Sequence, residues 1–226
     1  MRRFYKLAAV GEGNLILLDG RPVKTPGRRD LAPPTGALAE AIADEWNAQE
    51  DRVDPRSMPL TGLAYAAIDR VAPDPAAFAR GLAAYGESDL LCYRAEGPAA
   101  LAARQSELWD PLLAWAQQRY EIVLEVASGI IHMKQPGETI DRLGAAVGSR
   151  DPFQLAGLSP LVTISGSLLI ALALAEGAIG LEAAWAAAIV DEIWQAEKWG
   201  EDAEAAAALA NRRRDFAAAA RFLALL

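Results

Sequence analysis

The residues best suited to chemistry in this chain lie in one short segment, Asp191 to Asp202. The segment reads DEIWQAEKWGED and combines five acidic residues with two tryptophans, a glutamine and a lysine. Paired carboxylates can act as general acid and general base, as they do in glycoside hydrolysis. Large aromatic side chains beside acidic groups are also typical of surfaces that bind other proteins. The segment therefore supports two hypotheses, a catalytic site and a binding surface.

Outside this segment the chain offers few groups for catalysis or metal binding. Its one histidine, His132, and its one cysteine, Cys92, are too few for a zinc site, which takes three or four protein ligands. Gly11–Gly13 lacks the third glycine of a dinucleotide-binding loop, and Ser165–Ser167 has the wrong flanking spacing for a nucleophile elbow. We interpret His132 as a structural histidine in an apolar strand. We expect no metal and no cofactor.

Helical spacing divides the acidic segment into two faces. Glu192 shares a face, at intervals of three, four and seven, with Trp185, Ala188, Ile189, Ala196 and Trp199. A carboxylate on such an apolar stripe is unfavourable unless it is paired, so we expect an arginine partner or partial exposure. The neighbouring face carries Asp191, Trp194, Gln195 and Lys198. Glu201 follows the expected break at Gly200, and with Glu192 it is the best candidate for a catalytic pair.

Composition excludes several classes of function. The formal net charge is −8 and the sequence pI is about 4.8, whereas a nucleic-acid-binding protein needs a basic face. The lone Cys92 cannot form an intramolecular disulfide, which is typical of a reducing compartment. The longest apolar run, Leu161 to Ala175, has about 15 residues and is too short to span a membrane. We expect a cytoplasmic protein without a nucleic-acid partner and without membrane insertion.

The N-terminal part of the chain has the pattern of a small sheet. Short apolar runs over 5–10 and 15–18 are separated by a glycine-containing turn, and after Asp19-Gly20 the segment 21–26 is extended because of its prolines, which predicts a meander of about three strands. Thr35 is a candidate N-cap for a following helix whose buried face includes Trp46. Residues 121–133 are rich in β-branched side chains, and a small meander is marginal alone. We therefore predict that this later segment completes the N-terminal sheet.

The rest of the chain has helical spacing and alanine-rich composition. Asp110-Pro111 resembles a helix start, because proline is favoured in the first turn. The predicted helices cover residues 62–71, 76–86, 98–108, 111–119, 153–158, 161–176, 181–199 and 202–224. The sequence predicts an α+β fold that is mostly α. We expect a small α+β domain at 1–50, its sheet completed by 119–135, and a helical bundle formed by 51–118 and 136–226.

Several short blocks occur in a recognisable order along nearly the whole chain. They are Arg3–Lys6, Leu18–Pro26, Glu45–Gln49, Met58–Thr61, Tyr85, Asp89–Arg94, Gln105, Trp109–Leu113, Ser165–Ser167 and the acidic segment 191–202. Together they resemble the assembly chaperone family of the F-type ATP synthase, whose members bind the alpha subunit of the catalytic sector. The resemblance is to both mitochondrial and alphaproteobacterial-type members.

The resemblance implies a small N-terminal β-sheet unit and a larger, orthogonally packed helical bundle. It also implies a protein that is not an enzyme and uses no cofactor. Such a chaperone shields the interface of the unassembled alpha subunit until the beta subunit replaces it, in the bacterial cytoplasm or the mitochondrial matrix. We expect the protein to be monomeric when free. The acidic segment supplies the partner-binding candidates Glu201, Glu192, Trp194, Gln195, Trp199 and Asp202.

Two alternatives remain open at the level of sequence. One is a small-molecule hydrolase or lyase that uses the carboxylates of Glu192 and Glu201. The other is a general scaffold that binds several protein partners. The scarcity of nucleophiles and histidine bases favours binding over catalysis.

Overall fold

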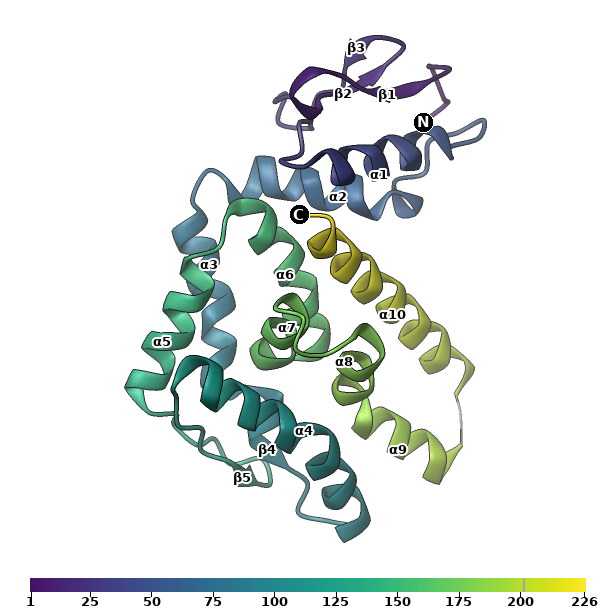
Figure 1. Ribbon diagram of the computed structural model, residues 1–226. Helices are drawn as coiled ribbons and strands as arrows, with labels where there is room; N and C mark the ends of the chain where they lie inside the picture. The colour runs from purple at the N-terminus through teal and green to yellow at the C-terminus, as the bar shows by residue number, and fades with distance from the viewer. Residues whose placement is uncertain (201) are drawn as a thin grey trace. The chain divides into compact units, whose positions relative to one another are not determined.

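The chain divides into two compact units in the computed structural model, which describes residues 1–200 and 202–226 (Figure 1). The first unit contains Met1–Pro75, Asp151–Gly157 and Arg221–Leu226, and the second contains Ala76–Arg150 and Leu158–Ala220. The sequence led us to expect a first domain that ends near residue 50. The first unit instead extends to Pro75. Helices predominate and a small antiparallel sheet lies near the N-terminus, which confirms the predicted mostly helical α+β fold.

The sheet of the first unit is the predicted meander of three short strands. Strands β1 (Ala8–Val10), β2 (Ile16–Leu18) and β3 (Arg21–Pro22) are antiparallel and lie in sequence order. Asp19 and Gly20 form the two-residue turn between β2 and β3, with φ angles of 48° and 78°. Positive φ at both positions matches the twist of a hairpin, which explains the Asp-Gly pair.

One helix packs on this sheet and supplies six of the sixteen buried residues of the core cluster. Helix α1 (Gly36–Asn47) begins at Thr35, whose hydroxyl accepts a hydrogen bond from the Leu38 amide at 3.2 Å, as predicted for an N-cap. The core contains Ile16, Leu31, Leu38, Ile42 and Trp46, and Trp46 is only 6% exposed. The prediction that Trp46 is a core residue is therefore confirmed.

The next helix is attached to α1 through one carboxylate. Helix α2 (Pro59–Ala66) continues into a π-helical turn at Ala67–Val71. The Glu45 carboxylate accepts hydrogen bonds from the backbone amides of Leu60 and Thr61, both at 2.8 Å. These amides lie in the first turn of α2, where no helical carbonyl can reach them. Glu45 therefore fixes the start of α2 against α1.

The prediction that residues 119–135 complete the N-terminal sheet is wrong. Strand β5 (Ala127–Ser128) pairs in parallel with β4 (Tyr93–Arg94), within the second unit. The extended stretch before β5 is held by side chains instead of a β-ladder. The Gln135 amide both donates to and accepts from the Glu125 backbone, at 2.9 and 3.0 Å. Side-chain pairing of this kind satisfies backbone groups that would otherwise need a neighbouring strand.

Residues 1–200 and 202–226 contain eight further helices. They are α3 (Pro75–Ala83), α4 (Ala99–Tyr120), α5 (Gly137–Gly148), α6 (Pro152–Ser165), α7 (Leu168–Ala175), α8 (Leu181–Ala188), α9 (Val190–Trp199) and α10 (Ala203–Ala224). Short 3-10 helices occupy Glu12–Asn14, Pro55–Ser57, Ala84–Ser88 and Leu90–Cys92. Within the part of the chain that the structure describes, no helix is both long enough and apolar enough to cross a membrane.

Three predicted helix boundaries are wrong. Helix α4 passes through Pro111 without a break, since Pro111 and Glu107 are exposed and the carbonyl that proline leaves unpaired can reach water. The predicted helix over 161–176 is two helices, separated at Gly166, whose φ is 69°. The predicted helix over 181–199 also breaks, at Ile189. Both breaks allow separate apolar helix faces to be buried.

Candidate functional site

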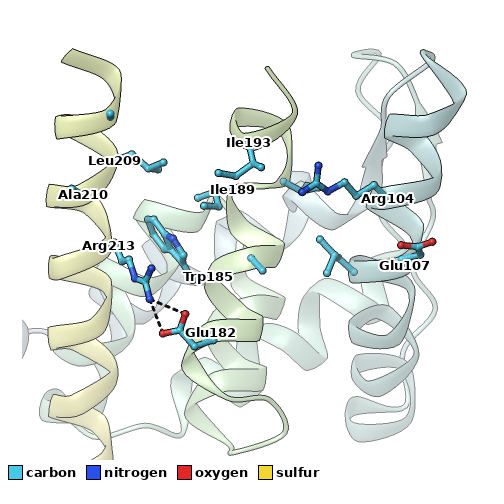
Figure 2. A pocket seen from close by; sticks show the side chains of 13 residues that line it. Arg104, Glu107, Glu182, Trp185, Ile189, Ile193, Leu209, Ala210 and Arg213 are labelled. Atoms are coloured by element: carbon cyan, nitrogen blue, oxygen red, sulfur yellow. Dashed lines mark hydrogen bonds and ion pairs between the residues drawn. The ribbon is translucent and has the colours of Figure 1, made fainter. Parts of the chain in front are cut away.

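A groove of about 580 Å³ lies between four helices of the second unit. Its lining comes from α4 (Arg104, Glu107 and Leu108), from α8 and its junction with α9 (Glu182, Trp185, Ala186 and Ile189), from α9 (Val190 and Ile193) and from α10 (Ala206, Leu209, Ala210 and Arg213). Figure 2 shows Trp185, Ile189 and Ile193 between the helix that bears Leu209 and Arg213 and the helix that bears Arg104 and Glu107.

The floor of the groove is apolar and well packed. Trp185 and Ile189 are each 5% exposed, and the Trp185 ring lies 5.5 Å from the ring of Phe216 on α10. Ile193 and Leu209 are only half-buried and present apolar surface to the groove. Trp185, Ile189 and Ile193 follow one another at four-residue intervals, so their side chains share a face despite the break at Ile189. The groove can therefore accept an apolar side chain.

Two ion pairs form the rim of the groove. The Arg213 guanidinium contacts both oxygens of Glu182 at 2.7 and 2.8 Å, and joins α10 to α8 (Figure 2). The Arg104 guanidinium contacts both oxygens of Glu197 at 2.9 Å, and joins α4 to α9. Exposed pairs of this kind add little stability but orient charge around the apolar floor. The groove thus has the apolar centre and polar edge of a protein-binding surface.

Buried polar contacts hold the walls of the groove in place. The Gln105 side chain, 2% exposed, donates to Asp191 at 2.7 Å and accepts from the Ala95 amide at 2.8 Å. The buried indole of Trp109 donates to the Ala187 carbonyl at 2.8 Å. These contacts fix α4 to both α8 and α9. The shape of the groove is therefore preformed.

Glu192 has the arginine partner that its sequence position predicts. Its carboxylate contacts the Arg212 guanidinium at 3.0 Å, and Arg212 also donates to the Ile164 carbonyl at 3.3 Å. The side chain of Glu192 is 42% exposed. The pair connects α9 to α10 and lies outside the residues that line the groove. Glu192 is thus committed to a contact between helices.

The placement of Trp199 on the inward face is wrong. Trp199 is 79% exposed, because α9 ends at this residue and Gly200, with φ of 90°, turns the chain away. Trp194 is half-buried, and the Lys198 ammonium group lies 4.8 Å from the centre of its ring. Gln195 is exposed. The end of α9 therefore presents an aromatic and polar surface to solvent.

Asp202, another acidic candidate, lies at the start of α10. Asp202 is exposed, and its carboxylate accepts a hydrogen bond from the Glu204 amide at 3.1 Å, as a residue that caps a helix does. Glu201, the remaining candidate, lies outside the described residues. None of the partner-binding candidates with a described position lines the groove.

The sequence did not indicate the groove, although Trp185 and Ile189 already belong to the apolar stripe that helical spacing predicts. The apolar members Trp185, Ile189, Ile193 and Leu209 were visible as helical faces. The charged pairs Arg104–Glu197 and Glu182–Arg213 join residues far apart in the chain. Helical spacing, such as the interval of four between Leu209 and Arg213, indicates only which residues share a face of one helix.

The other side chains that could act as a nucleophile or a base are two serines, a histidine and a cysteine. The hydroxyls of Ser165 and Ser167 are buried and hydrogen-bonded within the chain. His132 is exposed and in no strand, contrary to expectation, and its Nδ1 lies 3.2 Å from the Tyr93 hydroxyl. Burial raises the pKa of the Cys92 thiol to about 12, so the reactive thiolate is scarce at neutral pH. Among the described residues, no group of three or more histidine, cysteine or acidic residues could hold a metal ion.

Comparison with known proteins gives matches over half to nearly all of the chain. A family model described as ATP12 chaperone protein matches residues 2–117. The chain is 29% identical over 219 residues to the mitochondrial protein atp12 of Schizosaccharomyces pombe, and the match covers 89% of this chain and 75% of that protein. Atp12 from Paracoccus denitrificans has a similar structure, with a TM-score of 0.94 and 44% identity over 99% of this chain and 97% of that chain. A protein from Agrobacterium tumefaciens gives a TM-score of 0.92 and 42% identity over 98% of this chain and 85% of that chain.

Proposed function

Because the chain belongs to the ATP12 chaperone protein family, we propose that it assists assembly of the ATP synthase by binding the unassembled alpha subunit. Family membership confirms the resemblance drawn from the sequence blocks. The step from family to partner is our inference. In this proposal the chain holds the alpha subunit until the beta subunit replaces it, and it catalyses no reaction.

The groove between α4, α8, α9 and α10 is the observation that carries this proposal. A ring subunit that has not yet met its neighbour exposes an apolar interface, which promotes aggregation. A chaperone can remove this hazard by mass action, and it needs only a surface that binds the interface. The apolar floor around Trp185 and Ile193, with its charged rim, supplies such a surface.

The end of α9 extends this surface in our proposal. Trp199 is an exposed aromatic residue on a helix that also lines the groove, and exposed aromatic anchors are enriched among binding hot spots. We assign it the anchoring role. The further partner-binding candidates in this proposal are Glu192, Trp194, Gln195, Glu201 and Asp202.

The cellular setting follows from the same proposal. We infer that the chain acts in a bacterial cytoplasm as a monomer until it meets its partner. The similarity to proteins from Paracoccus denitrificans and Agrobacterium tumefaciens supports the bacterial setting. The relative from Schizosaccharomyces pombe is named as mitochondrial.

Binding of separately produced subunits tests the proposal. The chain is immobilised and exposed in turn to the isolated alpha subunit, the isolated beta subunit and a chemically unfolded unrelated protein. We expect retention of alpha alone, and suppression of alpha aggregation measured by light scattering. Equal retention of all three would indicate a general scaffold. Failure to retain the alpha subunit would refute the proposal. Turnover of a small molecule that Glu192→Gln abolishes would indicate a hydrolase or lyase.

A further inference from the structure

Charge is distributed very unevenly along the chain. Residues 1–29 contain seven lysine and arginine residues and two acidic residues, although the whole chain has a net charge of −8. All of these residues lie in the first unit. The first 29 residues therefore carry a local excess of positive charge in an acidic protein, and such an excess attracts an acidic ligand.

A second hollow, of about 800 Å³, lies within the same unit. Its lining consists of Met1, Phe4, Tyr5, Leu18, Asp19, Arg21, Pro22, Val23, Lys24, Thr25, Pro26, Trp46 and Tyr65. Phe4 lines the hollow and is 64% exposed. Its ring meets that of Tyr5 edge-on, with ring centres 5.4 Å apart. The Tyr5 ring meets the buried Trp46 in the same way, at 5.5 Å. A continuous row of aromatic rings thus runs from the surface into the hollow.

One polar atom beside this row lacks a partner. The indole Nε1 of Trp46 is buried and makes no hydrogen bond within the described part of the chain. A buried donor without an acceptor destabilises the fold by about 1 to 3 kcal/mol. Burial also raises the pKa of Tyr65 to about 12, so its hydroxyl keeps its proton at neutral pH. Trp46 and Tyr65 both line the hollow, and each carries a protonated donor group.

Arg21 and Lys24 are the two basic side chains among the described residues that line the hollow, and only one of them has an acidic partner. The Asp19 carboxylate accepts from the backbone amides of Lys6 and Leu7, at 3.1 and 3.0 Å, and these bonds lower its pKa. Lys24 is paired with Asp30 at 2.6 Å. Arg21 is exposed, and the described residues provide it with no ion pair. The unpaired guanidinium of Arg21 is suited to a carboxylate on an incoming ligand.

We propose that this hollow is a second docking site, which takes a peptide segment of the partner with an aromatic or aliphatic residue beside an acidic one. The apolar side chain would lie against Phe4 and Tyr5, and the carboxylate would pair with Arg21. The proposal rests on the proposed function in one respect, that the segment belongs to the same unassembled subunit. A nucleic acid is a poorer fit, since affinity for its backbone needs many unpaired cations and the described lining of the hollow contains only two basic side chains, Arg21 and Lys24.

A short peptide tests the site without the subunit. The full-length chain, labelled with nitrogen-15, is titrated with the acetylated tetrapeptide Asp-Phe-Glu-Leu, and the indole signal of Trp46 is followed by NMR. We expect that signal to shift, with saturation at millimolar peptide. The matched peptide Lys-Phe-Lys-Leu should shift it far less. No shift with the acidic peptide would overturn the proposal, as would an equal shift with heparin, which would indicate a general anion site.

Binding of the alpha subunit then tests the role of the site. Arg21→Glu and Phe4→Ala should each weaken the affinity about tenfold. Arg28→Glu, which changes charge in the same basic stretch but outside the hollow, should change it less than about twofold. Wild-type affinity in Arg21→Glu and Phe4→Ala would overturn the docking role. Absence of alpha binding by the wild type would refute the proposed function, while the peptide titration would still decide whether the hollow binds acidic segments.

Discussion

The buried carboxylate of Asp89 accepts a hydrogen bond from the hydroxyl of Ser167 at 2.6 Å. Asp89 also accepts from the Leu169 amide at 3.0 Å and from the Leu91 amide at 3.1 Å. The Ser167 hydroxyl accepts in turn from the Ile170 amide and so caps α7. Ser165–Ser167 is therefore a junction between two buried helices, and the Ser-Gly-Ser pattern serves structure.

The Asp89–Ser167 contact predicts a particular pH dependence of stability. Burial raises the pKa of Asp89 from 3.8 to about 6, in opposition to its hydrogen bonds. The folded state therefore binds a proton more tightly than the unfolded state. The contribution of Asp89 to stability is fully present below about pH 3.8 and is lost as the pH rises through about 6.

Comparison with Asp89→Asn isolates this effect. The free energy of unfolding of the wild type, minus that of the variant, should fall by up to about 3 kcal/mol between acidic and neutral pH, since one pKa unit corresponds to about 1.4 kcal/mol. Urea denaturation at several pH values measures the difference. A difference that stays constant with pH would show that the pKa of Asp89 is not raised in the folded protein.

Glu45 should contribute to stability through the start of α2. Glu45→Ala removes the acceptor for the Leu60 and Thr61 amides, and we expect a loss of about 2 kcal/mol in the free energy of unfolding. Glu40→Ala, an exposed position on the same helix, should change stability by less than about 0.5 kcal/mol. Chemical denaturation of both variants gives the comparison, and equal losses would contradict the role assigned to Glu45.

Two tryptophans near the groove should differ in what they contribute. Trp199→Ala removes an exposed ring, so it should leave stability nearly unchanged and weaken binding of the alpha subunit about tenfold or more. Trp185→Ala removes a buried ring and should reduce the free energy of unfolding by about 3 to 5 kcal/mol. Calorimetry and a binding assay on both variants separate the roles. Unimpaired binding by Trp199→Ala would rule out an anchoring role.

The groove floor should control binding without controlling the fold. Ile193 is half-buried, so Ile193→Gln should lower the free energy of unfolding by about 1 kcal/mol. Because Ile193 lines the groove, the variant should also retain a smaller fraction of the alpha subunit. Glu204→Gln on α10 lies outside the groove lining and serves as the control. The two variants are compared by the retained fraction of alpha subunit and by thermal unfolding. Equal retention would exclude the groove as the docking surface.

The sequence alone predicted those features that depend on nearby residues. The N-terminal meander, the Thr35 cap and the burial of Trp46 were all predicted correctly, because turn chemistry and helical spacing act over a few residues. The pairing of Glu192 with an arginine was also predicted, since a carboxylate on an apolar face needs a partner. The ordered blocks further identified the family.

Only the tertiary structure decided how distant segments meet. Short strands pair wherever a matching edge is available, so local pattern could not tell that Ala127–Ser128 joins Tyr93–Arg94 instead of the N-terminal sheet. The groove depends on four helices, and its Arg104–Glu197 pair joins residues 93 positions apart. The acidic segment itself is evident in the sequence. Trp199 is exposed because α9 ends at this residue. Glu192 is held in an ion pair because of the helix that packs beside α9.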